Sequence, residues 1–325
     1  MRDRYGRKID YMRISVTDRC NFRCRYCMPD GIKQVPMSKI LTYEQIAEIC
    51  EAAVSSGITK FKITGGEPLV RLGCPDLVRM IREIPGTEQI TMTTNGMFLA
   101  EMLPELMKNG LDAVNISLDT LKPEVFRYIT GKDALPNVLA GIHSAAASGL
   151  KVKINAVLQQ GINDGEWEDL LLLAKDLPVD VRFIEMMPIG YGKGCQEVSN
   201  EVLLRKIRQK YPGTAEDPSV HGNGPARYVR LPGFLGAAGF ISAMHGQFCA
   251  SCNRIRLTSQ GRLKPCLCYG DTVDLMDVFR IQEREKRSSL LAERIAGAIR
   301  MKPEAHCFEH LRGVTEQGDM VQIGG

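Results

Sequence analysis

The chain has 325 residues, a formal net charge of +4, and 44% hydrophobic and 25% charged residues, which is the composition of an ordinary globular protein. So slight a charge indicates no general affinity for nucleic acid, and no run of about eighteen apolar residues predicts a membrane span. The charged amino terminus lacks the apolar segment of a secretory signal. Because its free thiols require a reducing interior, we expect a cytoplasmic protein without nucleic-acid or membrane partners.

Short β-rich runs alternate with helical patterns from residue 11 to about residue 187. We expect strands at 11–16, 58–63, 89–94, 113–118, 151–158 and 179–186. Helices are expected between them, near 43–56, 75–84, 97–109, 134–148 and 165–177. The first helix has a capping box formed by Thr42 and Gln45. This alternation predicts parallel strands with crossover helices, and six such units are too few for a closed eight-stranded barrel.

The first strand leads into a loop with three cysteines, Cys20, Cys24 and Cys27. Their C-x3-C-x2-C spacing brings three thiolates into one small volume, and soft sulfur ligands suit an iron–sulfur cluster. A structural zinc site is a poorer explanation, because it takes four protein ligands and no histidine lies near. A disulfide would use two of these cysteines and leave the third without a partner. Since a cubane has four irons, three cysteines leave one iron open to another ligand.

Polar groups follow the ends of the next strands, where parallel barrels collect their functional groups. The second strand leads into Gly65-Gly66-Glu67-Pro68, whose glycines let the backbone approach a ligand closely. Thr93 ends the third strand, either to meet a ligand or to cap the next helix, and Ser117 ends the fourth.

The last two of these strands carry basic side chains. Lys153 and Asn155 share one face of the fifth strand. A lysine inside a barrel needs an anion to pair with, whereas one at an exposed strand start does not, and the sequence leaves both open. The sixth strand brings Arg182 and then Met187, which either packs on a ligand ring or belongs to the core.

After Pro188 the alternation ends, so we expect one unit over 1–188 and a smaller unit over 189–325, beginning with a helix near 199–211. The second unit carries Cys249, Cys252 and Cys266 with C-x2-C-x13-C spacing around a hairpin at 254–263. Taken alone, this set suits zinc as well as a cluster, because His245 or Cys268 offers a fourth ligand. The remaining cysteines are expected to be solitary: Cys50, Cys74, Cys195 and Cys307.

The order of strand, three-cysteine loop and Gly-Gly-Glu-Pro resembles the radical S-adenosylmethionine (SAM) family. The resemblance implies an incomplete (β/α)6 barrel and a [4Fe–4S] cluster on the first cysteine set, with SAM at its open iron. One electron from the cluster splits SAM into methionine and a 5′-deoxyadenosyl radical in that family. The SAM contacts that the resemblance implies are Tyr26, Gly66, Ser117 and Met187.

The second cysteine set and its flanking arginines are similar to those of one branch of that family, the GTP 3′,8-cyclases, lyases of molybdenum cofactor biosynthesis. This resemblance implies a second [4Fe–4S] cluster on Cys249, Cys252 and Cys266 that holds guanine. Loss of the C3′ hydrogen of GTP, bonding of C3′ to C8 and a final reduction then give 3′,8-cyclo-7,8-dihydro-GTP. The implied GTP contacts are Arg13, Lys62, Thr93, Lys153, Arg254, Ile255 and Arg256, with Lys60 and Arg182 as weaker candidates. Lysine at 62 replaces the family's usual arginine and loses its bidentate fork.

The last two residues, Gly324 and Gly325, resemble the double-glycine tail that reaches into the active site of this family, whereas an idle end is the ordinary alternative. The resemblance implies as partners a reductant protein, such as flavodoxin or ferredoxin, and cyclic pyranopterin monophosphate synthase, which receives the product. The chain is expected to be a monomer or a homodimer. Two other classes stay open: a peptide-modifying radical SAM enzyme with an auxiliary cluster, and a colourless, zinc-stabilised RNA-binding protein.

Overall fold

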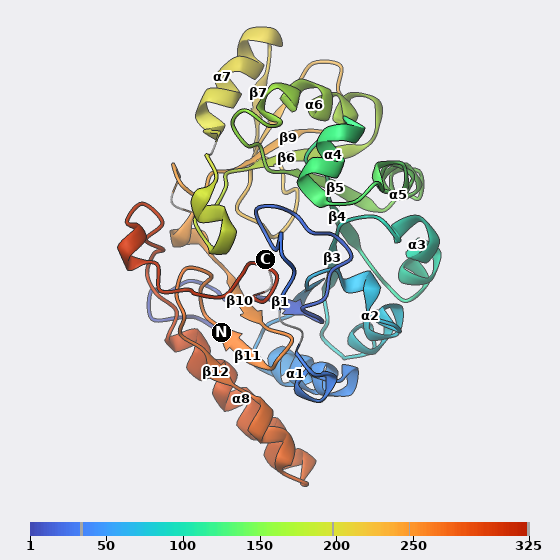
Figure 1. The fold of residues 1–325 in the computed structure, drawn as a ribbon. Coiled ribbons are helices and arrows are strands. Elements are labelled where there is room, and N and C mark those ends of the chain that lie inside the picture. The colour runs from blue at the N-terminus through green and yellow to red at the C-terminus, as the bar shows by residue number, and fades with distance from the viewer. Residues whose placement is uncertain (33–34, 197, 247, 324–325) are drawn as a thin grey trace.

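A twelve-stranded sheet organises the part of the chain that the computed structural model describes, residues 1–325 without 33–34, 197, 247 and 324–325. Figure 1 shows its strands arranged around a central axis with the helices outside. Six neighbouring strands are parallel and follow one another in chain order: β1 (Tyr11–Ser15), β2 (Lys60–Thr64), β3 (Gln89–Thr94), β4 (Ala113–Ser117), β5 (Lys151–Ala156) and β6 (Val179–Ile184).

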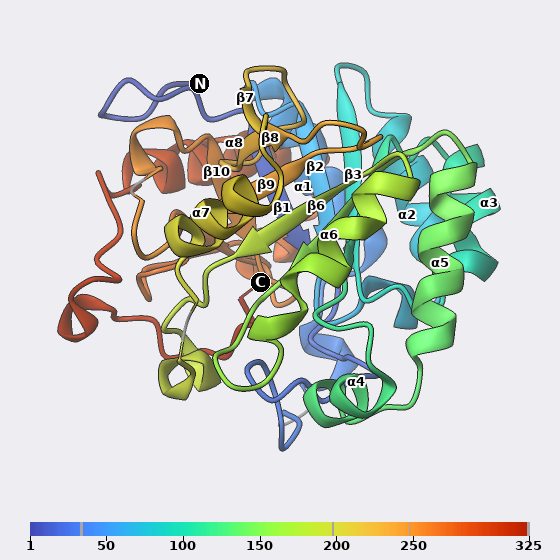
Figure 2. The same cartoon turned by 90° about the horizontal axis from the view of Figure 1, so that it is seen from above.

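Crossover helices connect these strands and cover the outer face of the sheet. They are α1 (Tyr43–Ser55), α2 (Cys74–Arg82), α3 (Leu99–Lys108), α5 (Leu135–Ala147) and α6 (Trp167–Asp176). Figure 2 shows α2, α3 and α5 side by side on that face. The predicted strands and helices are confirmed to within two residues at each end, and so is the capping box, in which Thr42 Oγ1 accepts from Gln45 N at 3.2 Å. The short α4 (Pro123–Thr130) was not predicted.

The second half of the chain extends the same sheet at both edges. β9 (Ala238–Ile241) is parallel to β6, and β10 (Arg254–Leu257) is parallel to β1. Eight parallel strands therefore stand in a row, but within the described residues no pairing joins β9 to β10, so the barrel is open. The expected incomplete barrel with a smaller carboxyl-terminal unit is confirmed, while the division at residue 188 stays a prediction.

Antiparallel strands finish the two edges. β8 (Arg227–Arg230) and β7 (Ala215–Asp217) lie beyond β9, whereas β11 (Arg262–Lys264) and β12 (Val273–Asp274) lie beyond β10. The predicted hairpin of β10 and β11 is confirmed, with Gly261 at φ 76° in its turn. The remaining helices are α7 (Asn200–Lys210), which was predicted, and α8 (Arg284–Arg300), which was not. Among the described residues no helix is long and apolar enough to cross a membrane.

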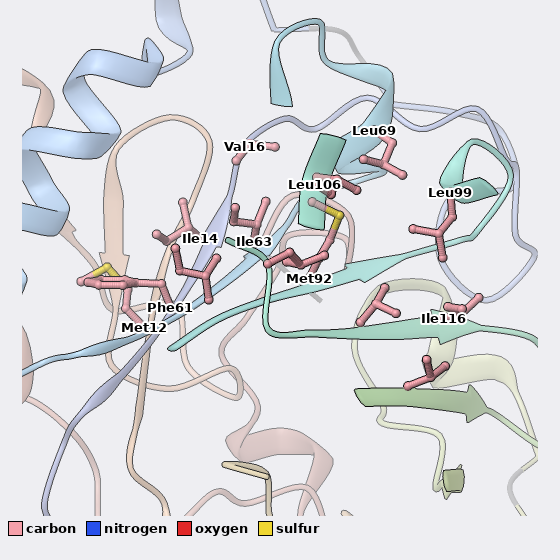
Figure 3. Close-up of a cluster of buried hydrophobic side chains, with 14 of the residues drawn as sticks. Met12, Ile14, Val16, Phe61, Ile63, Leu69, Met92, Leu99, Leu106 and Ile116 are labelled. Carbon is pink, nitrogen blue, oxygen red and sulfur yellow. The ribbon is translucent and has the colours of Figure 1, made fainter. Parts of the chain in front are cut away.

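Side chains alternate between an apolar outer face and a polar inner face along the parallel strands. Met12 and Ile14 of β1 and Phe61 and Ile63 of β2 are fully buried in the outer core, where Figure 3 shows them beside Met92 of β3. The residues between them face the barrel interior instead. A parallel strand with polar residues on its inner face indicates that the interior holds a site rather than a packed core.

Candidate active site

The loop that follows β1 carries Cys20, Cys24 and Cys27, each with a free thiol. Burial raises the pKa of Cys20 to about 11 and that of Cys27 to about 12. Burial also raises the pKa of Cys24, and the charges of Asp119, Cys27 and Cys20 add to this effect. The three thiols thus lie close enough to influence one another. Because iron binds thiolates, metal binding here displaces protons.

The donor set suits an iron–sulfur cluster, because three soft thiolates can each bind a different iron of a cubane and leave the fourth iron open. Hydrogen bonds to the sulfur atoms are also typical of cluster sites, and Phe22 N donates to Cys20 Sγ at 3.4 Å.

The Gly-Gly-Glu-Pro loop after β2 lies against the backbone that enters the cysteine loop. Gly66 N donates to Thr17 O at 2.7 Å, and Glu67 N donates to Arg19 O at 2.8 Å. A Cβ atom on Gly66 would lie 2.3 Å from Arg19 O, a distance that no side chain tolerates. Glycine at this position therefore permits close approach to the protein's own backbone, in addition to any approach to a ligand.

Two of the expected SAM contacts, Tyr26 and Ser117, line one cavity of about 40 Å³ together with Cys24 and Asn95. This space holds about one water molecule, so it marks where the side chains converge and not the full extent of a SAM site. Tyr26 Oη donates to Asp119 Oδ2 at 2.7 Å, and burial raises the pKa of this carboxyl group to about 6. No role was predicted for Asp119, because its contact with Tyr26 joins segments that are distant in sequence.

The second set, Cys249, Cys252 and Cys266, lies at the opposite end of the barrel. β10 is parallel to β1, so Cys252, just before β10, lies near the amino ends of the parallel strands, whereas the first set follows their carboxyl ends. Cys266 reaches the same place because β11 is antiparallel to β10. Burial raises the pKa of Cys249, and the charges of Cys266 and Cys252 raise it further, so these thiols are neighbours too.

The pKa of Cys252 is lowered from its usual value. Burial alone would raise it, but the positive charges of Arg254 and Lys302 outweigh burial and lower the pKa to about 6. A thiolate is therefore available for iron at neutral pH. His245, the alternative zinc ligand considered above, bonds through Nδ1 to Glu185 Oε1 at 3.1 Å.

Basic side chains on five strands occupy inner-face positions between the two cysteine sets. Arg13 stands in register with Arg256 on one side and with Lys62 on the other. Lys153 stands in register with Asn115, whose Nδ2 donates to Thr93 Oγ1 at 3.4 Å. The strands thus bring together most of the expected GTP contacts. Ile255 is the exception, since its side chain is fully buried in the hydrophobic core on the other face of β10.

These cations are crowded and largely removed from water. Lys62 is 8% exposed, and burial followed by repulsion from Arg182 and Arg13 lowers its pKa well below the usual value. Burial and Arg182 lower the pKa of Lys153 to about 7. Burial lowers the pKa of Arg13 to about 10. Such a group of buried like charges favours a ligand with several negative charges, because pairing offsets both desolvation and repulsion.

A loop over residues 218–226 lies beneath the cations at the amino end of the barrel. Lys153 Nζ donates to His221 O, and Asn223 Nδ2 donates to Gln89 Oε1, so the loop reaches from β5 to β3. His221 is held by Asp180 Oδ2 at 2.8 Å and by a second carboxylate from β7. No role was predicted for this loop from the sequence. The loop lies against the side chain of Lys153, since a Cβ atom on Gly222 would be 2.5 Å from Lys153 Nζ.

The carboxyl-terminal tail links the two cysteine sets. His306 N donates to Cys249 Sγ at 3.3 Å, and the backbone of Val321 lies close enough to Cys27 to lower the pKa of that thiol, although burial outweighs this effect. In Figure 1 the tail returns from α8 to the centre of the barrel, beside β1 and β10. Met187 packs beside it, against the cluster of Ile189, Leu267, Cys268, Phe308 and Ile323. Gly324 and Gly325 themselves lie outside the described residues.

One cysteine expected to be solitary is not. Cys307 Sγ lies 3.4 Å from Cys268 Sγ, on the tail segment that follows His306. The prediction was wrong because the two residues are far apart in sequence, and only the return of the tail to the β10–β11 hairpin brings them together.

Comparisons with known proteins agree with this geometry. A family described as the Radical SAM superfamily matches residues 14–174, and one described as Molybdenum Cofactor Synthesis C matches residues 179–308. The chain is 43% identical over 328 residues to a protein of Clostridium perfringens named GTP 3′,8-cyclase, covering 100% of both. It is 45% identical to one of the same name from Peptoclostridium acidaminophilum, covering 99% of this chain and 98% of the relative.

A solved structure supports the fold. Streptococcus suis SuiB bound to S-adenosylmethionine superposes with a TM-score of 0.61 at 14% identity, covering 97% of this chain and 78% of that one. Together with the full-length relatives, this places the architecture among radical SAM proteins. The chain belongs to the GTP 3′,8-cyclase family of the radical SAM superfamily.

Proposed function

We propose that this protein cyclises GTP by joining C3′ of the ribose to C8 of the guanine, giving 3′,8-cyclo-7,8-dihydro-GTP in the first step of molybdenum cofactor biosynthesis. The observation that supports it best is the group of buried cations between two three-cysteine sets at opposite ends of one barrel. A triphosphate carries about four negative charges, which suits several Arg and Lys side chains that are largely removed from water.

The first cysteine set, Cys20, Cys24 and Cys27, holds a [4Fe–4S] cluster that binds SAM. When bound, these groups would supply the one-electron chemistry for loss of the C3′ hydrogen of GTP, and the reductant would return one electron, with a proton, after the C3′–C8 bond has formed. The chain's own part is to position them. Gly66 keeps its loop against the cysteine loop, Tyr26 is fixed by its bond to Asp119, and Ser117 and Met187 complete the SAM site.

The nucleotide lies along the barrel axis, between the two sets. Lys62, Lys153 and Arg13 bind the phosphates, and Thr93 bounds the same space. Cys249, Cys252 and Cys266 hold the second [4Fe–4S] cluster, and Arg254 and Arg256 orient the base beside it, with Ile255 contributing its main chain only. Closure by the tail, ending in Gly324 and Gly325, excludes water from the reacting carbon atoms.

The cellular setting follows from the same chemistry. Radical formation takes one electron at a time, so the protein works with a reductant such as flavodoxin or ferredoxin in the cytoplasm, where thiols stay reduced. Its product passes to cyclic pyranopterin monophosphate synthase. Neither a monomer nor a homodimer conflicts with a site built from one chain.

Product analysis after anaerobic reconstitution with iron and sulfide tests this proposal. The protein is incubated with SAM, a chemical reductant and GTP, with ATP or a model peptide as the matched alternative. We expect 5′-deoxyadenosine and a cyclised nucleotide of unchanged mass from GTP alone. Turnover of the peptide without turnover of GTP would instead assign the chain to peptide modification, and a colourless reconstituted protein would exclude both.

A further inference from the structure

Cys268 and Cys307 form a thiol pair outside the two cluster-binding sets. Their Sγ atoms are 3.4 Å apart, and Cys307 N donates to Cys268 Sγ, also at 3.4 Å. Both thiols are free. The Sγ separation exceeds a disulfide bond length of about 2.05 Å by little more than one ångström, so a small rotation of each side chain brings the sulfur atoms within bonding distance.

The two thiols differ in access to solvent. Cys268 is fully buried in the cluster of Ile189, Leu267, Phe308 and Ile323, whereas Cys307 is partly exposed. A small oxidant therefore meets Cys307 first. Gly313 lies against this thiol, since a Cβ atom there would be 2.9 Å from Cys307 Sγ, so the tail itself forms part of the wall around the pair.

A disulfide bond between Cys268 and Cys307 would affect the carboxyl-terminal tail because of where the two residues lie. Cys268 belongs to the hairpin side of the second set, and Cys307 belongs to the tail, 39 residues further along. The tail contacts Cys249 through His306 just before the pair and Cys27 through Val321 after it. A covalent link at this point would fasten the tail between its contacts with the two cysteine sets.

We propose that Cys268 and Cys307 are a reversible redox pair whose disulfide fastens the carboxyl-terminal tail to the β10–β11 hairpin. Hydrogen peroxide, the class of oxidant that an iron–sulfur protein meets in air, oxidises the Cys307 thiol to a sulfenic acid and releases one water. The Cys268 sulfur then attacks the Cys307 sulfur, the S–O bond breaks, and a second water leaves. Two thiols and one peroxide thus give one disulfide and two waters, and a dithiol reductant restores both thiols.

Disulfide mapping on the reconstituted holoprotein tests the proposal. The protein is treated with one equivalent of peroxide, alkylated and digested, while absorbance and iron content verify that the clusters remain. We expect a linked peptide pair carrying Cys268 and Cys307, lost in Cys268→Ser and in Cys307→Ser. It persists in Cys195→Ser, the matched control at a partly exposed thiol outside both sets.

Amide hydrogen exchange distinguishes a disulfide that fastens the tail from oxidation of Cys307 without a link. Exchange of residues 303–313 slows by about tenfold on peroxide treatment and recovers with dithiothreitol, since a link across so long a loop opposes local opening. Cys268→Ser shows no such change. Sulfinic acid at Cys307 without a link, or a link from Cys307 to Cys266, would overturn the proposal. None of these readouts depends on GTP turnover, so the inference stands or falls separately from the proposed function.

Discussion

The buried position of Lys62 favours binding of an anion but destabilises the protein when no anion is bound. It is buried among other cations that repel it. A lysine with a structural role would stabilise the fold, whereas a lysine kept for a ligand destabilises the empty site and stabilises the occupied one. The two roles therefore make opposite predictions for its removal.

We predict that Lys62→Met weakens GTP binding by ten- to a hundredfold, about 1.5–3 kcal/mol for a charged hydrogen bond, while it raises the thermal unfolding midpoint without GTP. Lys62→Arg retains binding, because arginine also pairs with phosphate. Lys108→Ala, at the exposed end of α3, changes neither quantity. Anaerobic equilibrium binding and calorimetry measure both. Unchanged GTP affinity in Lys62→Met, or a lower unfolding midpoint, contradicts the assigned role.

The lowered pKa of Lys153 predicts that the protein takes up a proton when its substrate binds. Burial and Arg182 lower its pKa to about 7 in the free protein, so above pH 7 it is mainly neutral and donates to His221 O. A bound phosphate favours the charged form and raises this pKa. GTP binding at pH 8 therefore takes up as much as about one proton, and affinity falls as the pH rises further above 7.

Titration calorimetry at pH 8, in buffers of different ionisation enthalpy, measures this uptake. GTP phosphates are already ionised at that pH, so the protein supplies the site of protonation. Lys153→Met is expected to reduce the uptake and Lys108→Met, on the exposed end of α3, to leave it as it is. Binding enthalpies that do not vary with the buffer would refute the linkage.

At the scale of elements, the loop after β2 and the loop after β1 act as one unit. Gly66 permits their contact, since a Cβ atom there would lie 2.3 Å from Arg19 O. We predict that Gly66→Ala separates the two loops and impairs both the first cluster and SAM cleavage, while the second cluster keeps its iron. Iron content and 5′-deoxyadenosine formation are the measurements.

Gly297→Ala is the matched control for this substitution. Gly297 lies in α8, and nothing lies within 4 Å of a Cβ atom placed there. This change is expected to leave both clusters in place and to stabilise the helix by about 0.5–1 kcal/mol. If Gly66→Ala behaved like Gly297→Ala, the contact between the loops would have no part in holding the cluster.

The tail is the second element with a testable role. Its described part contacts both cysteine sets, through His306 and Val321. We predict that removal of residues 324–325 abolishes cyclisation but leaves the iron content and the SAM-binding capacity of the protein intact. Full turnover in this truncated protein would show that the last two residues have no part in the reaction and that the tail has only a structural role.

The elements that sequence analysis predicted share strong local signals. β1 to β6 and their helices have regular apolar periodicity, and the glycines and cysteines of the two sets lie within short spacings. α8 was not predicted because its sequence is highly charged, and β7 to β9 were not predicted because they are short. Asp119, the loop at 218–226 and the Cys268–Cys307 pair were missed because each depends on contacts between segments distant in sequence.

At the scale of the whole molecule, one sheet connects the two halves of the chain. β9 and β10 come from the second half and extend the two edges of the barrel that the first half builds. α8 supports this arrangement from outside, where Arg287 Nε pairs with Glu48 Oε1 of α1 at 2.8 Å. The two cysteine sets are thereby held at opposite ends of one interior, with the cations between them.

The most direct test of this account is electron paramagnetic resonance of the reduced protein with and without GTP. In the reconstituted protein we predict about eight irons per chain, and about four in either triple variant, Cys20→Ala/Cys24→Ala/Cys27→Ala or Cys249→Ala/Cys252→Ala/Cys266→Ala. GTP changes the cluster signal that remains in the first triple variant, and SAM changes the signal that remains in the second. A cluster signal insensitive to GTP in the first variant, or loss of all iron from both variants, would contradict two separate centres facing a shared substrate site.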